Sequence, residues 1–187
     1  MSITNIIADN QNLTFDYKGT LLEAAVLRRT LMTEIPTYAI HIVIFDKNTS
    51  ALVDELIALR LGLLIIDNEK LTDSQKKSRI HYEITGPLKF NSRHMKEIHF
   101  VHNTPIIELR ENEQLIFDVI IEEGIGNSNV KWCPVSGVTF DEKDSIIKFK
   151  LENLGMLSHE SLLQKMIEKQ SVTSNRKPIT IYQEIPK

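Results

Sequence analysis

Three histidines stand close together in the middle of the chain, and such spacing is a first candidate for metal chemistry. The stretch HMKEIHFVH places His94, His99 and His102 within nine residues. If Glu97 to Val101 forms a strand, His99 and His102 point to opposite faces, because they differ by an odd number of positions. No acidic or cysteine ligand is placed to complete a site. Weighing a metal site against solvated or hydrogen-bonded histidines, we favour the histidines without a metal.

A second candidate is the glycine-rich segment GIGNSN, Gly124 to Asn129, which follows a predicted strand as a dinucleotide-binding loop would. The third glycine of that motif is absent, and Pro134 follows where the phosphate-binding helix should run. We therefore interpret the segment as a tight turn whose glycines adopt positive φ.

Other residue types that carry out catalysis lack a recognisable arrangement. The sequence holds no G-x-S-x-G, P-loop, H-E-x-x-H or C-x-x-C motif. The carboxylates Asp54 and Glu55 are sequence neighbours, as are Glu122 and Glu123, so each pair is split between different faces. Such pairs suit solvated surfaces or contacts with a partner better than acid–base catalysis. We expect no catalytic residues and no cofactor.

Composition and charge describe an ordinary globular protein. The 187 residues are 42% hydrophobic and 25% charged, which suits one domain or two small intertwined ones. A net charge of −3 argues against a protein that mainly coats nucleic acid or an anionic membrane. Cys133 is the single cysteine and excludes an intrachain disulfide, and no secretory signal or spanning segment is visible. We expect an intracellular protein without a membrane partner.

The elements that must position these residues differ between the ends and the middle of the chain. Helices are predicted at residues 21–35, where Thr20 and Glu23 have capping-box spacing, at 51–60, and from about 158 to 170. Strands are predicted at 13–17, 37–45, 63–66, 79–84, 97–101, 106–109, 114–122 and 146–151, with a short strand-like segment at 179–182. This pattern indicates an α+β fold. The simplest assembly pairs the first strand and helix with the last, so that the β-rich middle is an insertion.

Arg28 and Arg29 interrupt the apolar pattern of the first helix although no chemistry surrounds them. Leucine or alanine stands on nearly every turn of this helix, which indicates burial on two sides, one of them against another chain. A plain core helix explains the composition almost as well. The last helix carries a comparable stripe of Leu162, Leu163, Met166 and Ile167.

The run LRRTLMTEIPTYAIHIVIFDKNTSALVDELIALRLGLLII strongly resembles the alpha-like subunits of multisubunit DNA-dependent RNA polymerases. That family includes the bacterial alpha N-terminal region, the archaeal D subunit and the third-largest subunit of the eukaryotic nuclear enzymes. The shared features are L-R-R, then E-[IV]-P-T-x-A-I, then N-T-[ST]-x-L-x-D-E-x-I-A-x-R-L-G-L. GIGNSNVKWCPVSGVTF and FKLENLGMLSHESLLQKMIE are similar to later blocks of the family, so the resemblance spans most of the chain.

The resemblance implies a dimerisation domain made from residues 1–46 and 140–187, interrupted by an inserted β-rich domain at 47–139. It implies a non-catalytic assembly subunit for transcription, which pairs with a smaller alpha-like subunit and docks the second-largest subunit. The rest of the polymerase core would complete the complex, with DNA contacted only indirectly. The alternative is a stand-alone protein-interaction module that kept the fold. The expected location is the nucleus or cytoplasm, or the virion if the polymerase is viral.

The resemblance also suggests which residues contact other subunits. Arg28 and Arg29 match the L-R-R arginines, which in the family lie toward the large-subunit interface, and Trp132 is expected to anchor an interface pocket. The inserted domain lacks the cysteines with which many relatives bind zinc or an iron–sulfur cluster, so no metal is predicted. The sequence departs from the family pattern at Ala25, His41 and Leu59. The expected interface residues are Arg28, Arg29, Glu34, Asp54, Glu55, Arg60, Lys131, Trp132, Leu162, Leu163, Met166 and Ile167.

Overall fold

The computed structural model describes residues 2–76, 78–173 and 180–181, and its fold is α+β. These residues divide into two compact units. Unit 1 combines the residues up to Thr37 with those from Ile125 on, and unit 2 spans Tyr38–Gly124. The divisions after Thr37 and Gly124 fall earlier in the chain than the predicted boundaries after residues 46 and 139.

Unit 1 contains a five-stranded sheet in which the two ends of the chain meet. Its strands lie in the order β10 (Thr180–Ile181), β1 (Ser2–Asp9), β2 (Asn12–Lys18), β9 (Ile146–Asn153) and β8 (Val135–Lys143). The expected pairing of the first predicted strand with the last is present, since Phe15 lies opposite Phe149 with their rings stacked at 4.9 Å. Strand β1 was not predicted, because a register shift after Thr4 and the positive φ of Asn5 interrupt its alternation.

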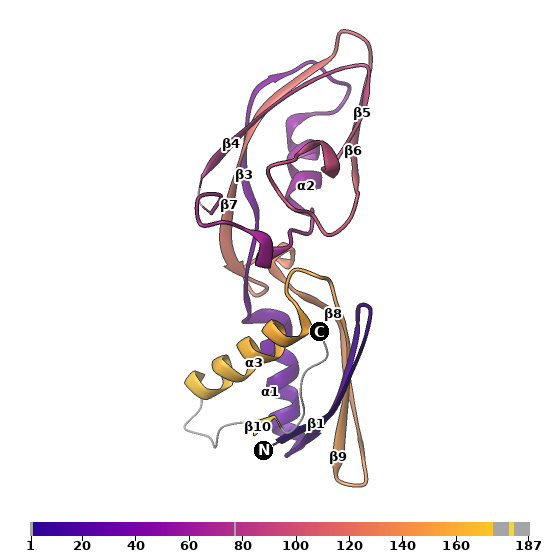
Figure 1. Cartoon of the computed structure of the whole chain (residues 1–187), viewed down its shortest axis with the longest axis vertical. Helices are drawn as coiled ribbons and strands as arrows, with labels where there is room; N and C mark the ends of the chain where they lie inside the picture. The colour runs from indigo at the N-terminus through magenta and orange to yellow at the C-terminus, as the bar shows by residue number, and fades with distance from the viewer. Residues whose placement is uncertain (1, 77, 174–179, 182–187) are drawn as a thin grey trace. The chain divides into compact units, whose positions relative to one another are not determined.

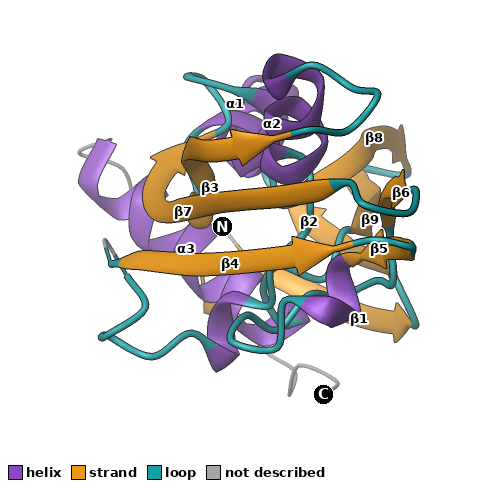
Figure 2. Ribbon diagram, turned by 90° about the horizontal axis from the view of Figure 1, so that it is seen from above, coloured by secondary structure: helices purple, strands orange, loops and turns teal. Residues whose placement is uncertain are grey.

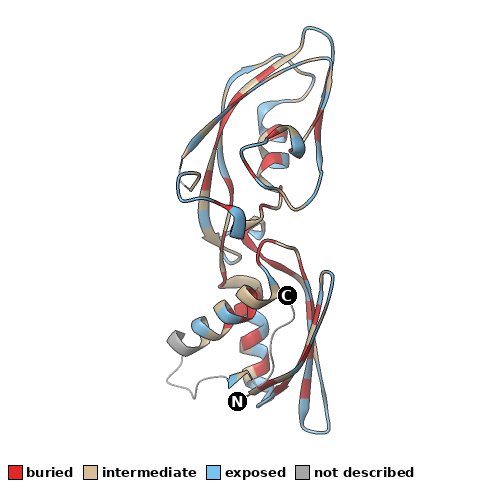
Figure 3. Cartoon of the chain, viewed as in Figure 1, coloured by how far each residue is buried: buried red, intermediate tan, exposed pale blue. Residues whose placement is uncertain are grey.

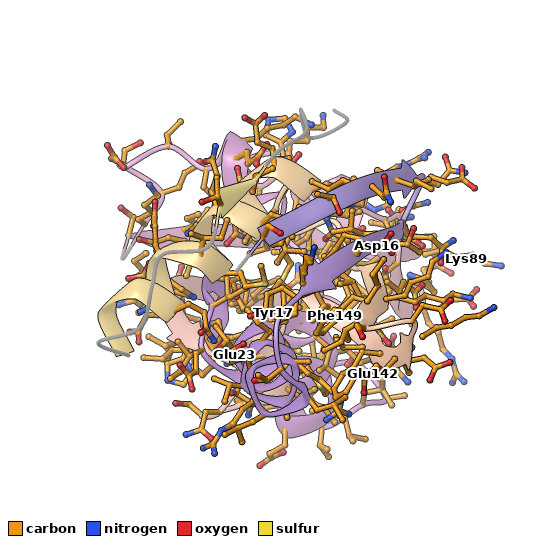
Figure 4. The ribbon with its side chains drawn as sticks, turned by 90° about the horizontal axis from the view of Figure 1, so that it is seen from below. Asp16, Tyr17, Glu23, Lys89, Glu142 and Phe149 are labelled. Carbon is orange, nitrogen blue, oxygen red and sulfur yellow. The ribbon has the colours of Figure 1, made fainter. Side chains whose placement is uncertain are left out.

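Two helices lie on the same side of this sheet, α1 (Leu21–Thr33) and α3 (His159–Thr173) (Figure 1). The predicted capping box is confirmed, because Glu23 N donates to Thr20 Oγ1 and Thr20 N donates to Glu23 Oε2 at 2.9 Å. Glu23 lies beside Tyr17, and Phe149 is close by (Figure 4); the Tyr17 hydroxyl donates to Glu23 Oε2 at 3.3 Å. Strand β9 alternates strictly between exposed and buried residues, so one face of the sheet is core and the other is solvated (Figure 3).

Unit 2 is built around one helix between two β-layers. Strand β7 (Gln114–Ile125) lies between β3 (Pro36–Asn48) and β4 (Arg79–Thr85), as Figure 2 shows. Strands β5 (Leu88–Asn91) and β6 (Pro105–Leu109) form a separate pair, and α2 (Asp54–Gly62) lies between the two layers (Figure 1). The core includes Ile57, Leu61, Phe90 and Phe117. Short 3-10 helices cover Asn68–Lys70 and Ser92–His94 in this unit and Val130–Trp132 in unit 1.

Two predicted strands of unit 2 do not form. Residues 63–66 and 97–101 meet only at a single bridge between Ile66 and Phe100. Leu64, Ile66 and Ile98, with 3%, 0% and 4% exposure, are core residues of these irregular segments, which a short apolar run cannot distinguish from a strand. The predicted helix at 51–60 begins at Asp54 instead, because the Asn48 side chain binds Ser50 and the Leu52 carbonyl and holds the preceding residues in a turn.

Candidate subunit interface

The two arginines of α1 have different surroundings although they are neighbours in sequence. Arg28 Nε donates to the main-chain oxygen of Val138 in β8 at 2.8 Å. The Arg29 side chain is exposed, and its guanidinium makes no hydrogen bond or ion pair with the residues that the structure describes. Arg28 therefore fastens α1 to the sheet of its own unit, whereas Arg29 remains available to another chain.

Helix α1 also exposes large apolar side chains. Its inner face is core, since Ala24, Leu27 and Leu31 are fully buried. On the outer side, Leu21 and Leu22 are 51% and 68% exposed. Leu22 stands seven residues before Arg29, which is close to two helical turns, so the two lie on the same face about 10 Å apart. This helix therefore combines a core face with a second face that its own unit leaves uncovered.

The C-terminal end of α1 is held by the glycine-rich corner. A Cβ on Gly126 would overlap the main-chain oxygen of Met32, and Asn127 N donates to Thr33 O at 3.0 Å. The expectation of positive φ in this corner was wrong, because the positive-φ glycines of the described chain are Gly137 and Gly155. A glycine is needed here because two backbones approach closely. Glu34 caps the helix through its N–H, which donates to Thr30 O at 3.0 Å.

Trp132 lies inside its own unit. It is 6% exposed, and its main-chain oxygen accepts a hydrogen bond from Thr37 Oγ1 at 2.7 Å. Lys131 covers the indole ring, with Nζ 4.6 Å from the ring centroid, in a cation–π contact. A partner would therefore meet the half-buried Lys131 first and little of the tryptophan.

Three of the four expected interface residues of α3 are core residues in this chain. Leu162, Leu163 and Met166 are each 0% exposed, whereas Ile167 is partly exposed. Helix α3 packs against α1 within unit 1, and these three side chains are already buried inside their own chain. Ile167 is the member of the stripe that another chain can reach.

The three polar residues expected on α2 also differ in their partners. Asp54 Oδ1 accepts a hydrogen bond from Asn48 Nδ2 at 2.7 Å, and Arg60 donates to the main-chain oxygen of Ile106 in β6. Glu55 is exposed and has no hydrogen bond or ion pair among the described residues. Asp54 and Arg60 therefore support unit 2, and Glu55 is accessible to a partner.

The structure reveals an apolar face on α2 that was missed from sequence. Val53, Leu56, Leu59 and Leu63 are 58%, 47%, 58% and 52% exposed, while the opposite side of the helix buries Ile57 and Leu61 in the core. The spacing of three or four residues was visible in the sequence as a signal of one helical face. The sequence shows an apolar stripe on this helix, but it does not show that the opposite side already packs in the core and leaves the stripe exposed.

Unit 2 also holds an ion cluster on the three-stranded sheet. Asp118, 4% exposed, accepts hydrogen bonds from Arg79 Nε at 2.5 Å and from His81 Nδ1 at 2.7 Å. Burial raises the pKa of Asp118, but the bonds from His81 and Arg79 outweigh it, so the pKa lies below its usual value. Asp46, His81 and Asp118 place one ligand atom each within 4.8 Å of one another. Because Arg79 already neutralises Asp118, this geometry suits an ion pair better than a metal ion.

Comparison with known proteins gives a consistent set of relatives. DNA-directed RNA polymerase subunit Rpo3 of Methanocaldococcus jannaschii is 28% identical over 162 residues, which is 84% of each chain. Its namesake in Pyrococcus furiosus is 32% identical over 138 residues, which is 66% of this chain and 52% of the relative. DNA-directed RNA polymerase II subunit rpb3 of Dictyostelium discoideum is 25% identical over 170 residues, 74% of this chain and 56% of the relative. No model of a known protein family matches the sequence.

The matches cover different shares of these relatives. The chain spans most of the Methanocaldococcus protein but only about half of the Pyrococcus and Dictyostelium proteins. Among the residues that the structure describes, no helix is long and apolar enough to cross a membrane.

Proposed function

Because the chain belongs to the alpha-like subunit family of DNA-dependent RNA polymerases, we propose that it is a non-catalytic assembly subunit of such an enzyme. In this role it pairs with a smaller alpha-like subunit and docks the second-largest polymerase subunit. The rest of the core enzyme then assembles on this pair, and the chain contacts DNA only indirectly. The complex works in the nucleus or cytoplasm, and the relatives give no support for a virion.

The exposed face of α1 is the observation that carries this proposal. Leu22 is 68% exposed on a helix whose opposite side is already complete as core. An apolar side chain of this size gains about 2 kcal/mol when it is fully buried against a partner. We assign Leu21 and Leu22, together with Ile167 of α3, to the contact with the smaller alpha-like subunit.

Contacts with the second-largest subunit are assigned to Arg29, which lies two turns beyond Leu22 toward the C-terminal end of α1, and to the outer face of α2. A guanidinium without an internal partner is well suited to carboxylates or carbonyls of another chain. On α2, Glu55 adds an exposed carboxylate beside the apolar residues Leu56 and Leu59, a mixture typical of protein interfaces.

Co-purification tests the proposal against the stand-alone interaction module. A tagged chain expressed in its native cell should recover the two large polymerase subunits and a small alpha-like protein, identified by mass spectrometry. The Leu22→Asp variant should no longer recover the small partner. The Arg29→Ala variant should lose recovery of the second-largest subunit before that of the small partner. Recovery of the folded chain without any polymerase subunit would overturn the assignment and favour the stand-alone module.

A further inference from the structure

The histidines of HMKEIHFVH have no part in the proposed function, yet the structure brings two of them to one place. Residues 97–101 do not form a strand, so His99 and His102 are not forced onto opposite faces. Both line a single pocket of unit 2 with a volume of about 340 Å³, together with Arg93 and Lys96. All four residues are exposed.

The lining of this pocket is positively charged, whereas the chain as a whole has a net negative charge. The protein carries a net charge of −3, but the pocket is lined by two permanent cations, two imidazoles and no carboxylate. A second cavity of unit 2, lined by Lys89, includes Glu108. A cavity on the sheet of unit 1, lined by Lys143, Lys148 and Lys150, includes Asp141. The pocket at His99 therefore differs from both, because nothing in its lining offsets the positive charge.

The rim of the pocket is held in place by the core of unit 2. Ser92, 1% exposed, donates through Oγ to His102 O at 2.8 Å and accepts from Thr104 N at 3.0 Å. On the other side, Asp67 N donates to His99 O at 2.9 Å, and Val101 N donates to Ile65 O at the same distance. These bonds use main-chain atoms of the two histidines, so the backbone of the rim is fixed at both positions.

Two acidic residues near the rim do not cancel its charge. Asp67 Oδ2 lies 2.8 Å from Lys70 Nζ, and Asp67 Oδ1 accepts a hydrogen bond from Glu69 N. Glu97 is exposed but is not part of the lining. An anion in the pocket would therefore meet the cations before it met a carboxylate.

We propose that this pocket binds phosphate groups. The planar fork of a guanidinium matches two phosphate oxygens, an ammonium adds a compact charge, and imidazoles donate further hydrogen bonds. The phosphate can come from a nucleic-acid backbone or from a free compound such as pyrophosphate. The site does not depend on the polymerase assignment, because it rests on the residues of unit 2 alone.

Binding to the full-length chain tests this site. The experiment has two arms. One measures binding of inorganic pyrophosphate by calorimetry, and the other measures binding of a labelled single-stranded oligothymidylate by fluorescence anisotropy. The double variant Arg93→Ala/Lys96→Ala should weaken binding in the responsive arm by about tenfold or more, since each charged hydrogen bond is lost. For the oligonucleotide, the slope of log K against log salt should fall by about 1.4, at about 0.7 per cation removed.

The chain offers a control of equal charge in its other unit. Lys148→Ala/Lys150→Ala removes two exposed lysines from β9 and should change binding by less than about twofold. His99→Gln/His102→Gln keeps the main-chain bonds of the rim and should weaken binding with unchanged circular dichroism. Binding of pyrophosphate alone identifies a site for free phosphates, and much tighter binding of the oligonucleotide identifies the nucleic-acid backbone. The proposal would be overturned if Lys148→Ala/Lys150→Ala weakened binding as much as Arg93→Ala/Lys96→Ala does. Equally tight binding of a polyglutamate peptide would also overturn it.

Discussion

Arg28 Nε donates a hydrogen bond to the main-chain oxygen of Val138, across 110 positions of sequence and a distance of 2.8 Å. The bond links helix α1 to strand β8 inside unit 1 and separates the role of Arg28 from that of Arg29. A pair that looks like one feature in the sequence is thus one structural residue and one residue open to a partner.

Replacing the two arginines one at a time should therefore have different effects. Arg28→Ala should lower the free energy of unfolding by about 1 kcal/mol, because the Val138 carbonyl loses its donor. Arg29→Ala should change stability by less than about 0.5 kcal/mol and should weaken docking of the second-largest subunit. Denaturant unfolding and co-purification measure the two effects. A normal unfolding curve for Arg28→Ala combined with lost docking would show that the roles are reversed.

Leucines on α1 and α3 should separate partner binding from folding. Leu22→Asp should leave unfolding almost unchanged and abolish recovery of the smaller alpha-like subunit, because Leu22 is 68% exposed. Leu163→Ala should cost about 2–5 kcal/mol, since Leu163 is fully buried and its removal leaves a cavity. Val130→Asp is the matched control, because Val130 is 72% exposed but is not assigned to the interface. Loss of the small subunit in Val130→Asp as well would point to a nonspecific effect of the added charge.

Asp118 should make the stability of unit 2 depend on pH. Its folded pKa lies below the usual value, so the unfolded chain binds the proton more readily and stability rises with pH through the acidic range. The contribution is present above about pH 4 and is lost as the pH falls through the folded pKa. Because Arg79 is 56% exposed, we discount the ion pair and expect Asp118→Asn to cost about 1–2 kcal/mol near neutral pH.

Urea unfolding of the wild type and Asp118→Asn at several pH values checks this expectation. The difference between the two proteins should shrink progressively as the pH falls below about 4 and through the folded pKa of Asp118. A Glu122→Gln variant is a suitable control, because Glu122 lies on the same strand but outside the cluster of Asp46, His81 and Asp118. A difference that stays constant from neutral pH to pH 3 would exclude the ionised carboxylate as its cause.

Gly126→Ala should destabilise unit 1 although alanine is a small change. The added methyl group would overlap the Met32 carbonyl, so either the corner or the end of α1 must move. We expect a cost of about 1–3 kcal/mol, as for other overpacked sites. Thermal unfolding measures it, with Gly137→Ala as a contrast in which positive φ rather than space is the obstacle. An unchanged melting temperature for Gly126→Ala would mean that the close approach is easily relieved.

The sequence alone determined the features that depend on neighbouring residues. The capping box of Thr20 and Glu23, the period of α1 and the alternation of β9 are local patterns, because caps and helical or strand periods involve residues a few positions apart. The α+β class follows from the order of such patterns. The resemblance to the polymerase subunits also lay in contiguous blocks, which needed no structure to be seen.

Only the tertiary structure decided which of these residues are accessible. Leu22 and Leu163 both belong to apolar helical stripes, and the fold buries one completely and exposes the other. His99 and His102 meet at one pocket because the segment between them is irregular rather than extended. Gly126 is required because a distant backbone lies against it. In each case, the outcome depends on which segments far apart in the chain pack together, and no local pattern of residue types contains that information.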